Sequence, residues 1–94
     1  MNARDIDWIN SEGNYVKFHA AGKRYMVRET MNAMERKLDP KMFVRIRRST
    51  IVRVEQISEL RPTLNGEFDV VLKSGAKLPS SRRYRQNLGF LFKS

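Results

Sequence analysis

The strongest constraint on the fold is a series of short segments in which apolar and polar residues alternate. Tyr15–Ala20 is the clearest case, because every second residue is apolar. A period of two residues is that of a β-strand with one buried face. This reading predicts short strands at residues 6–9, 15–20, 24–28, 43–47, 50–54, 57–63, 68–73 and 76–78. The expected fold class is therefore mostly β.

Turn-forming residues separate these segments at intervals that suit antiparallel hairpins. Ala21-Gly22-Lys23 is a short turn, and Ser74-Gly75 is another. Asn65-Gly66 predicts a two-residue hairpin turn in which both central residues have positive φ. The polar run 11–14 predicts a loop at the rim of the first hairpin.

Two windows have the period of a helix instead. The first runs from Thr30, the expected N-cap, towards Pro40, which ends it. Its apolar stripe is Met31, Met34 and Leu38. The second is C-terminal, with Ser80 or Ser81 as its cap and a stripe of Tyr84, Leu88 and Leu91. We therefore expect one or two short helices beside the strands.

Length and residue usage exclude several kinds of protein. Ninety-four residues make a single domain, residues 1–94. The absence of cysteine excludes disulfides, thiolate zinc sites and a cysteine nucleophile, and one histidine excludes a histidine-rich metal site. No nucleophile–base pair is visible, so we expect neither an enzyme nor a metal or other cofactor. With no signal peptide and no apolar run of about 18 residues, the expected location is cytoplasmic, without a membrane partner.

The net charge of +9 is concentrated in two segments. Residues 41–53 and 73–85 each hold five basic side chains and no acidic one. The remaining 68 residues hold 9 basic and 10 acidic side chains. Two basic patches on an otherwise neutral domain indicate a polyanionic partner, above all nucleic acid.

The first patch combines a strand with the loop that follows it. Val44 and Ile46 are expected to point inward, which places Arg45 and Arg47 on the outer face, about 7 Å apart. Arg48 falls where the alternation ends, and from a loop its guanidinium can pair bidentately with guanine. Ser49 can donate a hydrogen bond to a phosphate. A solvated sheet face beside a polar turn is the alternative, and for one basic strand in isolation it is the favoured one.

The second patch places Arg82, Arg83 and Arg85 in the first turns of the C-terminal helix. Cations at a helix N-terminus oppose the helix dipole, whereas an anion bound there is stabilised by free amide groups. The arrangement therefore favours phosphate binding. In the loop before the second strand, Asn14 can recognise adenine and Tyr15 can stack or contact a backbone, with Lys17 nearby. Taken alone, these residues are better explained by an ordinary loop at a hairpin rim.

Three motifs at matching spacing resemble one family. The run FVRIRRSTIVRVEQISEL resembles the F-x-R-x-H-R-S-x-x-V-N-like signature of the LytTR-type DNA-binding domain. Residues 9–16 look like that family's I-x-x-x-G-N-Y-V opening, and residues 78–84 look like its L-P-x-S-R-x-Y ending. The resemblance covers roughly residues 6–90. Arg47 and Arg53 stand where the family usually has His and Asn, and both add charge.

The resemblance implies an elongated fold of small antiparallel sheets packed together, which inserts loops into successive major grooves of duplex DNA. It also implies a bacterial response regulator of a two-component system, with transcription regulation as its role, dimers on repeated half-sites and an upstream regulatory domain outside this chain. Base contacts would fall to Arg48, Arg82, Asn14 and Tyr15. Phosphate contacts would fall to Arg45, Arg47, Ser49, Arg53, Ser81, Arg83 and Lys17. About six neutralised phosphates would give log K a slope near −5 against log salt.

Two other functions remain possible from the sequence. A β-rich RNA or single-strand binding module would need exposed aromatic rings as stacking platforms. Tyr15 is a candidate for such a ring, whereas Tyr25 and Phe43 are expected in the core. A module that binds acidic proteins would use the same basic patches but would not bind DNA.

Overall fold

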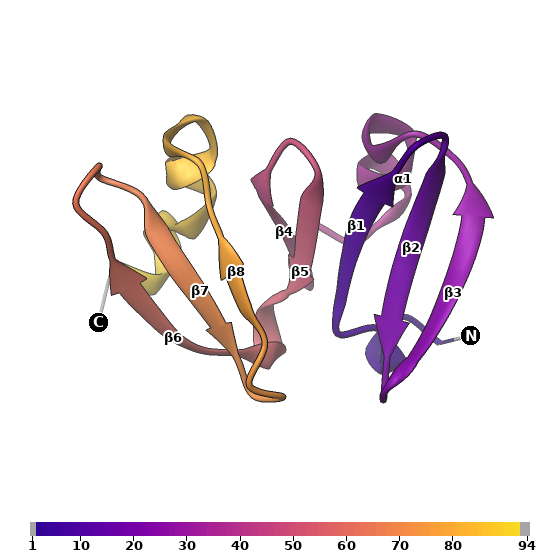
Figure 1. Cartoon of the computed structure of the whole chain (residues 1–94), viewed down its shortest axis with the longest axis horizontal. Helices are drawn as coiled ribbons and strands as arrows, with labels where there is room; N and C mark the ends of the chain where they lie inside the picture. The colour runs from indigo at the N-terminus through magenta and orange to yellow at the C-terminus, as the bar shows by residue number, and fades with distance from the viewer. Residues whose placement is uncertain (1, 93–94) are drawn as a thin grey trace.

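Two antiparallel sheets stand side by side in the computed structural model, which describes the backbone of residues 2–92 and the side chains of residues 2–89 (Figure 1). The molecule is elongated, measuring 34 × 23 × 21 Å. The first sheet has the order β3-β2-β1-β5-β4 and consists of β1 (Trp8–Glu12), β2 (Tyr15–Ala20), β3 (Lys23–Arg28), β4 (Phe43–Arg47) and β5 (Thr50–Arg53). The second has the order β6-β7-β8 and consists of β6 (Ile57–Pro62), β7 (Phe68–Leu72) and β8 (Lys77–Pro79).

Short helices accompany both sheets. The single α-helix of the described residues, α1 (Met31–Lys37), connects β3 to β4, and the 3-10 helices are η1 (Ala3–Asp5), η2 (Val54–Gln56) and η3 (Arg82–Phe92). Thr30 is the N-cap of α1, because its Oγ1 accepts a hydrogen bond from the Ala33 N–H at 3.1 Å. None of the described helices is long and apolar enough to cross a membrane. The predicted mostly β class with short helices is confirmed.

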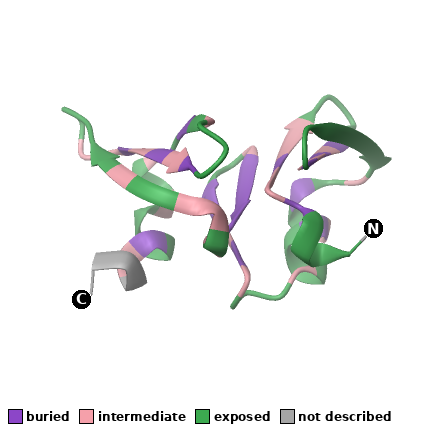
Figure 2. Cartoon of the chain, turned by 90° about the horizontal axis from the view of Figure 1, so that it is seen from below, coloured by how far each residue is buried: buried purple, intermediate pink, exposed green. Residues whose placement is uncertain are grey.

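Two apolar cores lie on opposite sides of the β4–β5 hairpin. The first fills the space between α1 and the large sheet and contains Ile6, Ile9, Val16, Phe18, Met31, Met34, Phe43 and Ile51. The second lies towards the small sheet and η3 and contains Ile46, Val52, Val70, Leu72, Leu78 and Leu88. Figure 2 shows buried residues concentrated on the strands in the middle of the molecule. The β4–β5 hairpin therefore has no broad solvent-facing side.

Three local predictions from the sequence were wrong. The first strand begins at Trp8, so Ser11 belongs to β1 and the turn to β2 is only Gly13-Asn14. This short turn is possible because Gly13 has a φ of 61°. Asn65-Gly66 is not a two-residue turn. Its loop is closed by the Thr63 N–H bonding to the Glu67 carbonyl at 2.9 Å, and only the glycine has a positive φ, of 76°.

The C-terminal helix forms as predicted, but it is a 3-10 helix. Ser80 does not cap it, because this buried hydroxyl accepts a hydrogen bond from the Phe68 N–H at 3.1 Å. Leu88 is fully buried, as its stripe position predicts, whereas the side chain of Leu91 lies outside the described residues. Tyr25 was expected in the core but is 43% exposed, because β3 is an edge strand.

Candidate nucleic-acid interface

Several connecting segments meet along one rim of the molecule and enclose a groove there. They are the β1–β2 turn, the β3–α1 connection, the β4–β5 turn and the start of η3, which lie along the upper rim in Figure 1. The groove has a volume of about 1050 Å³. Side chains that line it and can contact a polyanion are Asn14, Arg28, Arg47, Arg48, Ser49, Ser81 and Arg83. The structure thus brings together three segments that the sequence indicated separately.

Backbone hydrogen bonds fix these segments relative to one another. The Ser11 N–H donates to the Ser49 carbonyl at 3.0 Å, which ties the β4–β5 turn to β1. The Ser81 N–H donates to the Ile46 carbonyl at 2.9 Å, which ties the start of η3 to β4. The rim is therefore a pre-formed surface on a rigid sheet, the usual arrangement for binding loops.

The groove is strongly electropositive. Arg28, Arg47, Arg48 and Arg83 are exposed, and none has a carboxylate partner among the described residues. Glu29 is the one acid lining the groove within the described part of the chain, and Lys37 Nζ lies 2.5 Å from its Oε2. Charges of one sign in a concave site attract an anion more strongly than the same charges spread out.

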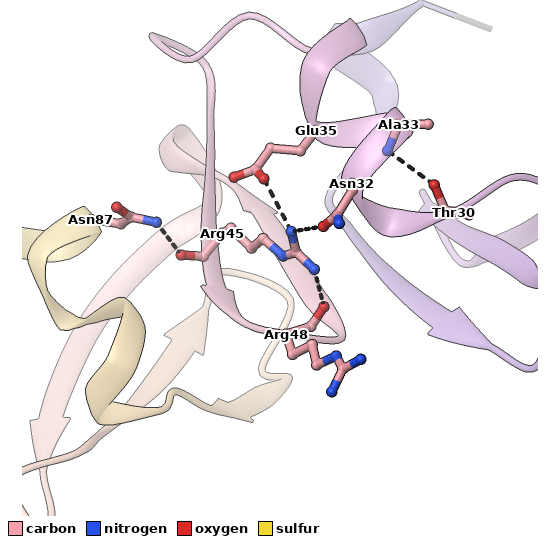
Figure 3. A network of polar contacts seen from close by, with 7 residues as sticks. All are labelled: Thr30, Asn32, Ala33, Glu35, Arg45, Arg48 and Asn87. Carbon is pink, nitrogen blue, oxygen red and sulfur yellow. Dashed lines mark hydrogen bonds and ion pairs between the residues drawn. The ribbon is translucent and has the colours of Figure 1, made fainter.

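Arg45 does not point outward beside Arg47, as the alternation predicted. Its side chain is 6% exposed, and its guanidinium bonds to Asn32, Glu35 and the Arg48 carbonyl (Figure 3). The pairing of β4 with β5 shifts between Arg45 and Arg47, so the two side chains do not share a face. Since β4 lies between two cores, a residue at an alternating polar position can be as buried as its apolar neighbours.

Arg53 is also buried, at 8% exposure. Its Nε donates to the Ile6 carbonyl at 2.7 Å, and its NH1 lies 2.9 Å from Glu55 Oε2. It does not line the groove. The guanidinium therefore holds the chain entering β1 against η2 within the fold.

Other predicted contact residues lie outside the groove. Lys17 forms an ion pair with Glu12, and this hydrogen-bonded ammonium lowers the pKa of the Glu12 carboxyl. Tyr15 is 43% exposed but does not line the groove. Arg82 lines a separate depression with Arg85, next to the Gly66 loop.

The lone histidine lies on β2. The His19 ring stacks on Trp8, with centroids 3.8 Å apart, and its Nε2 lies 2.6 Å from Asn10 Oδ1. Burial in this position lowers the pKa of His19. Within the described residues no three acidic or histidine side chains are grouped to hold a metal ion.

Two groove residues were not anticipated from the sequence. Arg28 is the last residue of β3, two residues before the N-cap of α1. A basic residue at the end of a strand was the sequence feature that could have indicated it. The Tyr84 ring has Arg45 Cζ at 5.4 Å and Arg83 Cζ at 5.9 Å from its centroid, distances typical of cation–π contacts. Only the fold brings that ring next to β4, and no local pattern indicated it.

Comparison with known proteins gives a consistent result. The family model of the LytTr DNA-binding domain matches residues 1–93. The chain is 32% identical over 88 residues to the sensory transduction protein LytT of Bacillus subtilis (strain 168), covering 94% of this chain and 36% of that protein. It is 26% identical over 87 residues to the transcriptional regulatory protein LytR of Staphylococcus aureus (strain N315), covering 93% and 35%. The chain thus spans about a third of the length of these relatives.

A solved structure has the same fold. It is a LytTr DNA-binding domain of a response regulator from Bacillus cereus, with a TM-score of 0.87 and 20% sequence identity. The match covers 97% of this chain and 84% of the other.

Proposed function

We propose, since the chain belongs to the LytTr DNA-binding domain family, that it binds double-stranded DNA sequence-specifically as part of a bacterial transcriptional regulator. The observation that carries the proposal is that exposed arginines from three separate segments line one groove: Arg28 at the end of β3, Arg47 and Arg48 at the β4–β5 turn, and Arg83 in η3. A buried or scattered distribution of the same charges would not form such a surface. As in the expectation from sequence, the regulator would act in the cytoplasm.

The shape of the molecule suits duplex DNA. Its long axis measures 34 Å, about one helical turn of B-DNA, so a molecule lying along the duplex has the length to reach successive major grooves. A major groove about 12 Å wide admits a two-stranded β-ribbon. The β1–β2 and β4–β5 hairpins belong to one five-stranded sheet, so in our proposal only their turns, at the rim, enter such a groove.

The geometry supports a revised set of contacts. In our proposal Arg48 and Asn14, at the tips of the two hairpins, contact bases, and Tyr15 beside Asn14 contacts the sugar–phosphate backbone. Arg82 lies outside the groove, so we assign it to a flanking phosphate instead of a base. The other phosphate contacts are Arg28, Arg47, Ser49, Ser81 and Arg83. Arg45, Arg53 and Lys17 are left out because their charges are paired within the fold.

Single-stranded nucleic acid fits the surface less well. Tyr15 and Tyr25 are each 43% exposed. Tyr25 pairs with Phe18, and Phe18 is three residues from Tyr15 on β2, so the side chains of Phe18 and Tyr15 point to opposite faces. The two rings therefore lie on opposite faces of the sheet and do not form one stacking platform.

Selection from a random duplex library, followed by fluorescence anisotropy at physiological salt, tests the proposal. We expect one enriched motif, present as repeated half-sites that bind two chains per duplex. Arg48→Ala should weaken binding to the enriched duplex by about 1–3 kcal/mol and relax the base preference at one position of the site. Lys17→Ala, the control, should change neither the affinity nor the base preference. Failure to enrich any duplex, or better competition by poly(U) than by duplex, would contradict the proposal.

A further inference from the structure

Arg45 connects three parts of the candidate interface. Its NH1 donates to Asn32 Oδ1 at 2.7 Å and to Glu35 Oε1 at 3.0 Å, both on α1. Its NH2 donates to the Arg48 carbonyl at 2.6 Å, in the β4–β5 turn. Its own carbonyl accepts a hydrogen bond from Asn87 Nδ2 of η3 at 2.8 Å (Figure 3). One buried residue thus joins α1, the β4–β5 turn and η3.

Stability alone does not account for a cation at this position. Removing a charge from water is costly, and a well-packed apolar residue in place of a buried ion pair is often neutral or stabilising. The compensation is also incomplete, because Arg45 Nε is buried without a hydrogen-bond partner among the described residues. Within the same part of the chain, the one carboxylate that pairs with the guanidinium, that of Glu35, is 47% exposed and so only a screened partner. A buried polar group that is only partly satisfied calls for an explanation.

The bond to the Arg48 carbonyl supplies that explanation. The β4–β5 turn consists of Arg48 and Ser49 alone, since Arg47 pairs with Thr50. Fixing the carbonyl of a two-residue turn fixes the plane of its central peptide, and with it the direction in which the Arg48 side chain leaves the backbone. In Figure 3 the Arg48 side chain points away from the network that holds its carbonyl.

We propose that Arg45 is a positioning residue for base recognition, which holds the Arg48 turn at a fixed place relative to α1 and η3 without touching DNA. The inference rests on the proposed DNA binding at the groove. Bidentate recognition of a base depends on placing the guanidinium within a few tenths of an ångström, whereas attraction to phosphates does not. Loss of Arg45 should therefore reduce the preference for the enriched site and leave non-specific binding intact.

The test compares Arg45→Met with Arg53→Met on the enriched duplex and on a scrambled one. Arg53 is a matched control, because it is equally buried but bonds to Ile6 and Glu55, away from the groove. We expect Arg45→Met to bind the enriched duplex about tenfold or more weakly and the scrambled duplex within about twofold of wild type, since one Arg–guanine pair is worth about 5- to 150-fold. Arg53→Met should keep the wild-type ratio of the affinity for the enriched duplex to the affinity for the scrambled one.

Two further measurements separate positioning from folding. Unfolding curves of both variants show whether each is folded at the binding temperature, and the ¹⁵N order parameter of the Ser49 amide should fall in Arg45→Met only. If Arg45→Met does not fold, Asn32→Ala serves instead, because it removes one hydrogen-bond acceptor of the Arg45 guanidinium. It should lower the ratio of enriched to scrambled affinity by a smaller factor. An equal loss on both duplexes, or an unchanged ratio, would overturn the inference. If wild-type protein itself showed no preference among duplexes, the proposed function would fail instead.

Discussion

The groove predicts how strongly salt weakens DNA binding. Each phosphate neutralised on B-DNA contributes about −0.9 to the slope of log K against log salt. The exposed arginines that our proposal assigns to phosphates are Arg28, Arg47, Arg82 and Arg83, and none has an acidic partner in the described part of the chain. The expected slope is therefore about −3.6, shallower than the value near −5 that the sequence alone suggests. Between 50 and 200 mM salt, affinity should fall about 150-fold.

Removing one groove arginine gives the sharpest version of this prediction. Arg83→Gln should change the slope to about −2.7, so that the same salt increase lowers affinity only about 40-fold. Lys17→Gln removes the same charge, but that ammonium is already paired with Glu12 and lies outside the groove. Its slope should stay at about −3.6.

The measurement is anisotropy of a labelled duplex with each variant at five concentrations of KCl. Both glutamine variants have the same net charge, so a general effect of charge on association would change both slopes equally. That outcome, or a wild-type slope near −5 that survives Arg83→Gln, would refute the assignment of the groove as the DNA-binding surface.

Three further predictions concern the fold that supports the groove. Leu88→Ala should lower the free energy of unfolding by about 2–5 kcal/mol in urea titrations, because this residue of η3 is fully buried in the second core. Leu64→Ala, at a fully exposed position, should change the free energy of unfolding by less than about 0.5 kcal/mol. Burial lowers the pKa of His19 below its ordinary 6.5, so the unfolded chain takes up the proton first and stability falls as the pH drops through 6.5. His19→Gln should therefore reduce the loss in Tm between pH 7.5 and 5.5, and an unchanged pH dependence of Tm would contradict this. Gly13→Ala should cost about 1 kcal/mol in the same urea titrations, since φ there is 61°, and should leave the Arg48 turn in place by NMR.

Alternation in the sequence predicted strands well wherever one face of the strand is solvated. Tyr15–Ala20 and Phe68–Leu72 bury every second residue, as their patterns indicate. The same reasoning failed for Phe43–Arg47, because this strand lies between two cores and contains a shift in pairing. Whether a polar position faces solvent depends on the second sheet, which no pattern within the strand reveals.

The Asn65-Gly66 turn shows how strand pairing can override local turn chemistry. The dipeptide favours a two-residue turn, yet Phe68 is buried and pairs with Pro62. That register leaves five residues between the strands, and the Thr63–Glu67 hydrogen bond closes them into a longer loop. The loop length therefore follows from the register that buries Phe68, because a hydrophobic pattern with one buried face specifies the pairing of strands.

The five basic residues of the first patch differ in their surroundings. Of the five basic residues in 41–53, Arg47 and Arg48 are exposed in the groove, whereas Arg45 and Arg53 are buried. The acid-free segment contributes Arg47 and Arg48 to the lining of the candidate groove. The sequence also assigned contacts to Arg45 and Arg53, because an arginine that holds the framework looks the same in sequence as one whose guanidinium is exposed in the groove.

These two kinds of arginine should differ in what their loss does. Removing an exposed groove arginine such as Arg47 should weaken all DNA alike, since phosphates carry no sequence information. Removing Arg45 should act mainly on specificity, because its guanidinium is only 6% exposed and holds the Arg48 carbonyl. In our proposal, then, the exposed groove arginines set how tightly DNA in general is held, and the hydrogen bonds of Arg45 set which DNA sequence is preferred.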